Sequence, residues 1–123
     1  MKRVSVLALS LLGLTGFTAL AEPTQDTLHF TMERYPGYFG EYCLDMKKGD
    51  VLEVTVDSPY PVRVNLHYHE DDAEAHFLLD EVKEDDRQSS VTISQDGEYC
   101  LQITNFEPRP ARFELTLDYE VIR

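Results

Sequence analysis

The sequence predicts an all-β protein that folds as a two-sheet antiparallel β-sandwich of seven or eight strands with one disulfide. Three observations support this prediction. Apolar and polar residues alternate with a period of two over several short segments, which is typical of strands with one buried face. Turn sequences rich in Gly, Pro and Asp separate these segments. Two cysteines occur in a chain whose first residues indicate export, and disulfides persist in exported proteins.

The strands expected in chain order are of unequal strength. Two weakly patterned segments, 28–33 and 39–45, come first and flank the turn sequence Pro36-Gly37. Clear alternation follows in 52–57 and 62–69, then again around Val91 and Ile93, in 99–103 and in 113–121. Turns are expected at Lys48-Gly49-Asp50, at Ser58-Pro59-Tyr60-Pro61 and at Asp96-Gly97. The segment 76–82 is a weaker strand candidate, and the spacing of Phe77, Leu78 and Val82 within 73–87 would also suit a short helix.

The first 21 residues have the features of a secretory signal peptide. Lys2 and Arg3 precede an apolar run over 4–20, and small residues before Ala21 provide a cleavage site. The alternative is an uncleaved membrane anchor, which the Ser, Thr and Gly residues within the run disfavour. We therefore predict bacterial export to the periplasm or the medium, with no membrane segment left after cleavage.

The remaining 102 residues suit a single domain, with a polar lead over 22–27 and the sandwich over 28–123. All 23 acidic residues lie in this part, together with nine of the 11 Lys and Arg residues, so its formal charge is −14. Nucleic acids and anionic lipids bind basic faces, so neither is an expected partner. A cation, a basic protein or a neutral glycan fits this charge better, and we predict a protein or cell-envelope component as the partner.

Cys43 and Cys100 are the two cysteines of the chain, so they allow a single intrachain disulfide. Closing a loop of this length would stabilise the fold by roughly 4 kcal/mol through the entropy of the unfolded chain. The alternative, a pair of free thiols that bind metal or exchange electrons, lacks the C-x-x-C spacing of such pairs.

The run Asp96-Gly97-Glu98-Tyr99-Cys100-Leu101-Gln102-Ile103-Thr104-Asn105 resembles the GOLD (Golgi dynamics) domain, in which a D-G-x-Y turn leads into a cysteine strand that ends in Asn. Tyr42-Cys43-Leu44 and the following Gly49-Asp50 are similar to the first cysteine strand of that domain, although both cysteines are displaced by about two residues from the family's positions. The resemblance spans roughly 28–121 and implies a jelly-roll-like sandwich, a disulfide and a binding role. Bacterial pre-peptidase C-terminal domains show a weaker similarity over 96–121.

Three of the four histidines lie within ten residues and suggest a metal site. His67 and His69 project from one face of the expected strand, and the acidic turn that follows carries Glu70 and Asp72, with His76 close behind. Imidazole and carboxylate donors suit copper or zinc. The alternative is a solvated strand face that leads into an acidic hairpin. A second acidic segment, 80–86, would suit weak calcium binding or simply a solvated face, since it lacks the spacing of a calcium loop.

Four aromatic residues surround two glycines and a proline in the segment 35–42 and suggest a partner-binding loop. They are Tyr35, Tyr38, Phe39 and Tyr42. Aromatic rings supply large contact areas to a protein or a glycan, and the alternative is that they cap the core.

No catalytic motif stands out, because the sequence has no G-x-S-x-G elbow and both cysteines are assigned to the bridge. The sequence thus predicts an exported, non-catalytic binding or accessory module; a metal-binding periplasmic protein is the main alternative, and a small hydrolase is a third.

Overall fold

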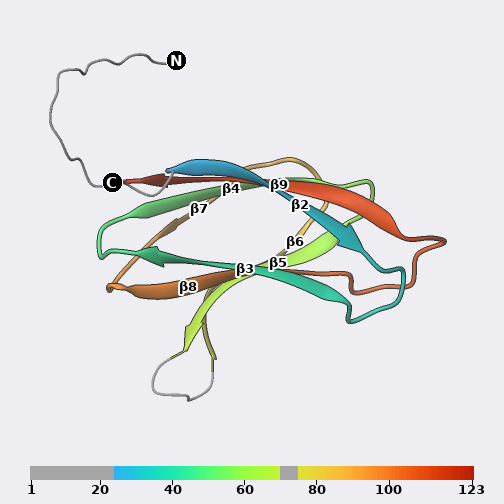
Figure 1. Ribbon diagram of the computed structural model, residues 1–123, viewed down its shortest axis with the longest axis horizontal. Coiled ribbons are helices and arrows are strands. Elements are labelled where there is room, and N and C mark those ends of the chain that lie inside the picture. Colours follow the sequence, from blue (N-terminus) through green and yellow to red (C-terminus); the bar gives the residue numbers. More distant parts are fainter. Residues whose placement is uncertain (1–23, 70–74) are drawn as a thin grey trace, which may run out of the picture.

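The computed structural model describes residues 24–69 and 75–123, which form a sandwich of two four-stranded antiparallel sheets (Figure 1). One sheet has the strand order β2-β9-β4-β7 and the other has the order β3-β8-β5-β6. The strands are β2 (Gln25–Met32), β3 (Phe39–Met46), β4 (Val51–Asp57), β5 (Val62–His69), β6 (Ala75–Lys83), β7 (Ser89–Thr92), β8 (Gly97–Thr104) and β9 (Phe113–Ile122). No helix of these residues is long and apolar enough to span a membrane. The predicted signal peptide lies outside the described residues.

The core fills the space between the two sheets, because the strands turn most of their apolar positions inward. Tyr99, Leu101 and Ile103 of β8 are fully buried, and the outward residues between them are polar or cysteine. Strand β9 alternates buried and more exposed positions over its whole length. The period of two read from the sequence is therefore the physical division between core and surface. Burying such side chains stabilises the fold by about 25 cal/mol per Å² of apolar area.

The disulfide joins two neighbouring strands of one sheet. Cys43 of β3 and Cys100 of β8 are paired directly across the ladder, with their Cα atoms 4.0 Å apart. The predicted fold class, with eight strands and this bridge, is confirmed.

Two segments of the chain differ in detail from their expected patterns. Strand β2 begins at Gln25, inside the predicted polar lead. The ambiguous segment around Phe77 forms strand β6 rather than a helix, because it pairs with β5 along its length. An irregularity between Leu66 and His67 leaves one extra residue on the β6 side, which obscures the alternation in the sequence.

A buried lysine links the two sheets where β6 lies close to β7. The side chain of Lys83, on β6, is only 6% exposed, and its Nζ donates to Ser89 Oγ of β7 at 2.7 Å and to the carbonyl of Arg87. Glu81 accepts a hydrogen bond from Ser89 Oγ and lies 3.4 Å from Lys83 Nζ. A buried ammonium is stable only with such partners, so this network ties one sheet to the other.

Candidate functional site

Three connecting segments meet at one end of the sandwich and form what we call the loop end. They are 33–38 between β2 and β3, 58–61 between β4 and β5, and 105–112 between β8 and β9. Binding residues in sandwich proteins commonly lie on such loops, because the sheets hold the loops in place.

Asn105 fixes the loop 33–38 at this end. Its side chain is fully buried, and its Nδ2 donates to the carbonyls of Glu33 and Tyr35, each at 3.2 Å. Its backbone amide donates to Tyr38 O at 2.9 Å, and its carbonyl accepts from Gly37 N at 2.7 Å. Gly37 has φ of 93°, a backbone conformation that favours glycine. The loop thus has one defined conformation although it has no strand partners.

Arg109 joins the other two segments to Asn105. Its guanidinium donates to Asn105 Oδ1 at 3.2 Å and to Pro61 O at 2.8 Å, and its side chain is only 10% exposed. The guanidinium also lies over the rings of Tyr60 and Phe106, with its Cζ 5.0 and 5.6 Å from their centroids. Such cation–π contacts add to the hydrogen bonds. Asn105 and Arg109 therefore act together as the support of the loop end.

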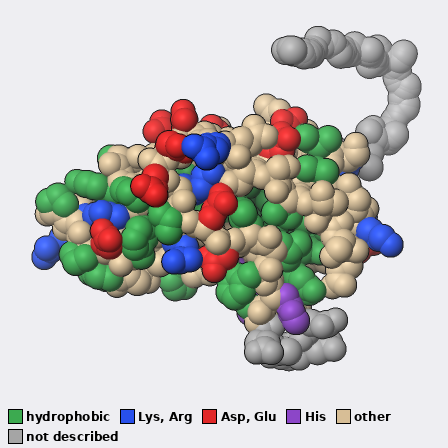
Figure 2. All heavy atoms as spheres, turned by 180° about the vertical axis from the view of Figure 1, so that it is seen from behind, with side chains coloured by type: hydrophobic (Ala, Val, Ile, Leu, Met, Phe, Trp, Pro, Cys, Tyr) green, Lys and Arg blue, Asp and Glu red, His purple; other side chains and the backbone are tan. Residues whose placement is uncertain are grey.

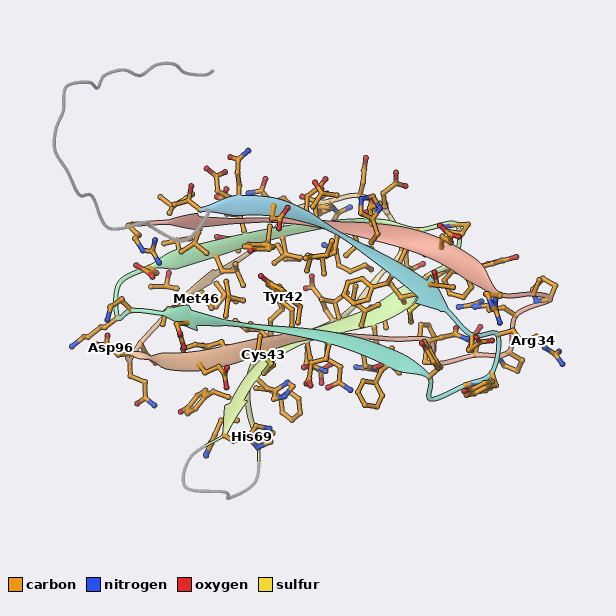
Figure 3. The ribbon with its side chains drawn as sticks, in the orientation of Figure 1. Arg34, Tyr42, Cys43, Met46, His69 and Asp96 are labelled. Carbon is orange, nitrogen blue, oxygen red and sulfur yellow. A yellow bond between two sulfur atoms is a disulfide. The ribbon has the colours of Figure 1, made fainter. Side chains whose placement is uncertain are left out.

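The surface that this support presents is aromatic and carries both arginines and glutamates. Tyr35 is 55% exposed and meets Tyr38 edge to face, with ring centroids 5.8 Å apart. Arg34 is exposed at the tip of the loop and points away from the sandwich (Figure 3). Arg112 contacts Glu33 at 3.1 Å and remains largely exposed. Hydrophobic side chains with interspersed basic and acidic side chains gather at this end of the molecule, on the left of Figure 2.

The four predicted aromatic residues do not form one patch. Tyr35 and Phe39 are about half exposed, whereas Tyr38 packs against the core. Tyr42 points between the sheets (Figure 3), where its ring lies 5.9 Å from that of Tyr119. Their role in binding a partner stays a prediction, and Tyr35 is the ring that the loop end exposes. The sequence does not indicate that Asn105 and Arg109 support the loop end. Asn105 belongs to the GOLD-like motif as its strand-ending Asn, and Arg109 lies outside that motif.

The sheet β2-β9-β4-β7 is acidic. None of its four strands contains Lys or Arg, whereas β4 and β9 together carry five carboxylates: Glu53, Asp57, Glu114, Asp118 and Glu120. Glu53 and Glu120 are direct cross-strand partners. Like charges in that position destabilise a sheet, so packing does not explain them. The protein is thus electrically asymmetric, with an acidic sheet face and arginines at the loop end.

The predicted histidine site lies on the outer face of the other sheet. His67 and His69 share this face, as expected, and their rings meet at 5.1 Å between centroids. His76 is paired with Tyr68 and stacks on its ring, so it does not join the other two histidines. Glu70 and Asp72 lie outside the described residues. Metal binding by this set stays a prediction.

His67 is buried, unlike a residue of a solvated strand face. Its Nδ1 lies 2.8 Å from Asn65 Oδ1, its Nε2 lies 3.3 Å from Glu41 Oε2, and the Phe77 ring lies beside it. Burial lowers the pKa of His67 below its usual value of 6.5, and the nearby Glu41 carboxylate opposes this shift only in part. The imidazole therefore favours its neutral form.

The acidic segment 80–86, a candidate for weak calcium binding, supplies partners for basic residues, and calcium binding there stays a prediction. Asp80 contacts Arg63 at 2.9 Å, and Asp85 contacts Arg87 at 3.5 Å. These pairs are typical of a solvated protein surface.

Comparisons with known proteins support the fold. No protein-family model matches the chain, and no curated protein matches it in sequence. Among solved structures, PliG of Aeromonas hydrophila, a periplasmic inhibitor of g-type lysozyme, superposes with a TM-score of 0.59 at 17% identity, over 85% of this chain and 92% of that one. PliG of Salmonella Typhimurium, also a periplasmic inhibitor of g-type lysozyme, gives 0.56 at 11% identity, over 85% and 94%. The chain therefore has the same β-sandwich fold as these two inhibitors.

Proposed function

We propose that the protein is an exported, non-catalytic inhibitor that binds a g-type lysozyme in the periplasm. The observation that carries the proposal is the superposition on two periplasmic inhibitors of g-type lysozyme over nearly their whole length. A fold alone does not define a function, so the proposal also needs a suitable surface. The predicted signal peptide agrees with this location, and the disulfide agrees with an oxidising compartment.

We infer that the loop end is the surface that contacts the enzyme. Tyr and Arg contribute a large share of the binding energy in protein interfaces, and Tyr35 and Arg34 are both exposed there. Asn105 and Arg109 hold the loop in place before binding, which lowers the entropy lost when the complex forms. Glycoside-cleaving enzymes carry catalytic carboxylates in the substrate cleft, and a guanidinium complements such a group.

The acidic sheet face contributes to association over a longer range. After the predicted cleavage the protein has a formal charge of −14 and attracts basic proteins, and complementary charge raises the association rate more than it lowers the dissociation rate. The association rate of the inhibitor with the enzyme is therefore expected to fall at high salt, because ions screen charges separated by more than about 8 Å at physiological ionic strength.

The test is inhibition of peptidoglycan lysis by a purified g-type lysozyme, with lysozymes of other types in parallel. We expect saturable inhibition at one inhibitor per enzyme. The double substitution Arg34→Glu and Tyr35→Ala is expected to weaken inhibition at least 30-fold, since two central contacts are each worth about 1–2 kcal/mol. Matched controls are Lys48→Glu, at the opposite end of the sandwich, and Phe77→Ala, on the outer face of β6; both should leave inhibition within threefold. Equal losses in test and control variants would reject the loop end as the contact surface, and inhibition of no lysozyme would reject the function.

The sequence also predicts a GOLD-like module and a metal site, and both are further proposals for this protein. The GOLD-like pattern over Asp96–Asn105 agrees with a sandwich module that binds other proteins, and a cell-envelope component is the alternative partner. Metal binding by His67 and His69 is a separate proposal, and a zinc or copper titration of the oxidised protein beside a His67→Ala, His69→Ala variant tests it.

A further inference from the structure

Metal-ligating atoms gather beside the disulfide on the outer face of the sheet β3-β8-β5-β6. Ligand atoms of Glu41, His67 and Cys100 all lie within 4.8 Å of one another, and Cys43 is bonded to Cys100. Figure 3 shows Cys43 on the side of β3 that faces away from the other sheet, the side on which His69 also lies. Three strands thus bring two sulfurs, an imidazole nitrogen and a carboxylate oxygen to one place, and these are the donors that bind zinc in proteins.

Asn65 orients His67 for such a role. Asn65 Oδ1 lies 2.8 Å from His67 Nδ1, and Asn65 Nδ2 faces Gln102 Oε1 at 3.5 Å, which defines the direction of the Asn65 amide. An amide oxygen only accepts hydrogen bonds, so in the neutral imidazole Nδ1 carries the proton and Nε2 presents its lone pair. That lone pair faces Glu41 Oε2 at 3.3 Å. These two lone pairs repel each other, and a cation bound between His67 Nε2 and Glu41 Oε2 would accept both. Asn65 would then hold the metal-binding imidazole in place through its hydrogen bond with Nδ1.

We propose that the protein, once its disulfide is reduced, binds one zinc ion through Cys43, Cys100, His67 and Glu41. In the oxidised protein the two sulfurs are bonded to each other and are not thiolates, so only His67 and Glu41 remain as donors. An external dithiol supplies two electrons and two protons: the Cys43–Cys100 bond breaks, both cysteines become thiols, and the dithiol becomes a disulfide. Zinc then displaces the two thiol protons to solvent.

To reach zinc geometry, the ligand atoms of Glu41, His67 and Cys100 have to move closer together than 4.8 Å, and the sulfurs of Cys43 and Cys100 have to separate once their bond is broken. Ligand atoms around a tetrahedral zinc are roughly 3.3–3.8 Å apart, as its bond lengths of about 2.0–2.3 Å require. Glu41 lies on the edge strand β3 with its side chain 37% exposed, so it can move toward the other three ligands. The metal would replace the covalent link between β3 and β8 and add a link to β5. This face would then exist in two chemical forms selected by the thiol conditions, whether or not the protein inhibits a lysozyme.

The test uses cobalt(II) and zinc(II) with the mature protein, fully oxidised in one sample and reduced with a dithiol that is then removed without oxygen in another. We expect the reduced protein to bind one equivalent of cobalt, with a thiolate-to-cobalt charge-transfer band, and zinc to displace it. The oxidised protein should show no such band. His67→Ala and Glu41→Gln should each weaken zinc binding at least tenfold, whereas His29→Ala, an exposed histidine on the other sheet, should leave it unchanged.

Reduction of the disulfide can itself unfold the protein, and circular dichroism of the reduced protein detects this. If the metal-free reduced chain unfolds, zinc should restore the spectrum in the parent and not in His67→Ala. A thiolate band that is equally strong in His67→Ala, zinc binding no tighter than that of a Cys43→Ser, Cys100→Ser variant, or a failure of zinc to restore a reduced and unfolded chain would each overturn the proposal.

Discussion

Substituting Asn105 tests whether a single buried side chain supports the loop end. The Asn105→Ala variant loses two hydrogen bonds to the carbonyls of Glu33 and Tyr35 and one from Arg109. Each is worth about 1 kcal/mol net, and the one from the charged guanidinium about 1.5–3 kcal/mol. We therefore expect the free energy of unfolding to fall by roughly 3.5–5 kcal/mol, a large part of the about 5–15 kcal/mol typical of a domain.

Urea unfolding followed by circular dichroism measures this loss. Asn105→Asp is the sharper variant, because it keeps an oxygen for Arg109 but places a carboxylate against two carbonyls, so it should be at least as destabilised as Asn105→Ala. Gln102→Ala, on the strand β8 that leads to Asn105, is the control. The Gln102 side chain makes one long contact, at 3.5 Å from Asn65, so its removal should lower the free energy of unfolding by less than about 1 kcal/mol. In the folded fraction, Asn105→Ala should also weaken lysozyme inhibition about tenfold or more, since Tyr35 is no longer held. A loss below 1 kcal/mol for Asn105→Ala would show that this side chain does not support the loop end.

Three further perturbations test other parts of the structure. Replacing both Cys43 and Cys100 by Ala should lower the free energy of unfolding by roughly 4 kcal/mol, as expected for a bridge between residues 57 positions apart; a thermal melt with and without reductant checks this, and equal melting temperatures would contradict it. Lys83→Met should cost about 2–3 kcal/mol in urea because the link between the sheets is lost, whereas the exposed Lys48→Met should change stability by less than 0.5 kcal/mol. The pKa of His67 is lower in the folded protein than in the unfolded chain, so the imidazole of the unfolded chain binds more protons below pH 6.5. The free energy of unfolding should therefore keep its full value above pH 6.5 and decrease as the pH falls below that value. The difference between the parent and His67→Gln in urea unfolding at pH 7.5 and 5.5 isolates this effect, and identical pH dependence in both would refute it.

The strand pattern was predictable because burial on one face imposes a period of two. Val62, Val64 and Leu66 lie in the core as their alternation indicated, and the turn at Gly49 adopts a φ of 95°, which suits glycine. Strand β6 was ambiguous because its extra residue opposite β5 interrupts the alternation. Local sequence does not report such an irregularity, since it depends on the partner strand.

The support of the loop end was not predictable, because it depends on contacts between distant segments. Asn105 bonds to carbonyls about 70 positions away, and Arg109 bonds to Pro61 from 48 positions away. Every residue has a backbone carbonyl, so the sequence does not indicate which carbonyls accept these hydrogen bonds. His67 was expected on a polar face, which was correct, but its burial was not, because Phe77 and His69 cover it from neighbouring positions.

The most direct test of the proposed function is hydrogen exchange of the protein with and without a g-type lysozyme. We predict that the enzyme slows exchange of backbone amides in 33–38 and 105–112, with little change in the turn at 47–50 at the opposite end. Absence of any protection, or protection confined to the acidic strands β4 and β9, would contradict the claim that the loop end binds the enzyme.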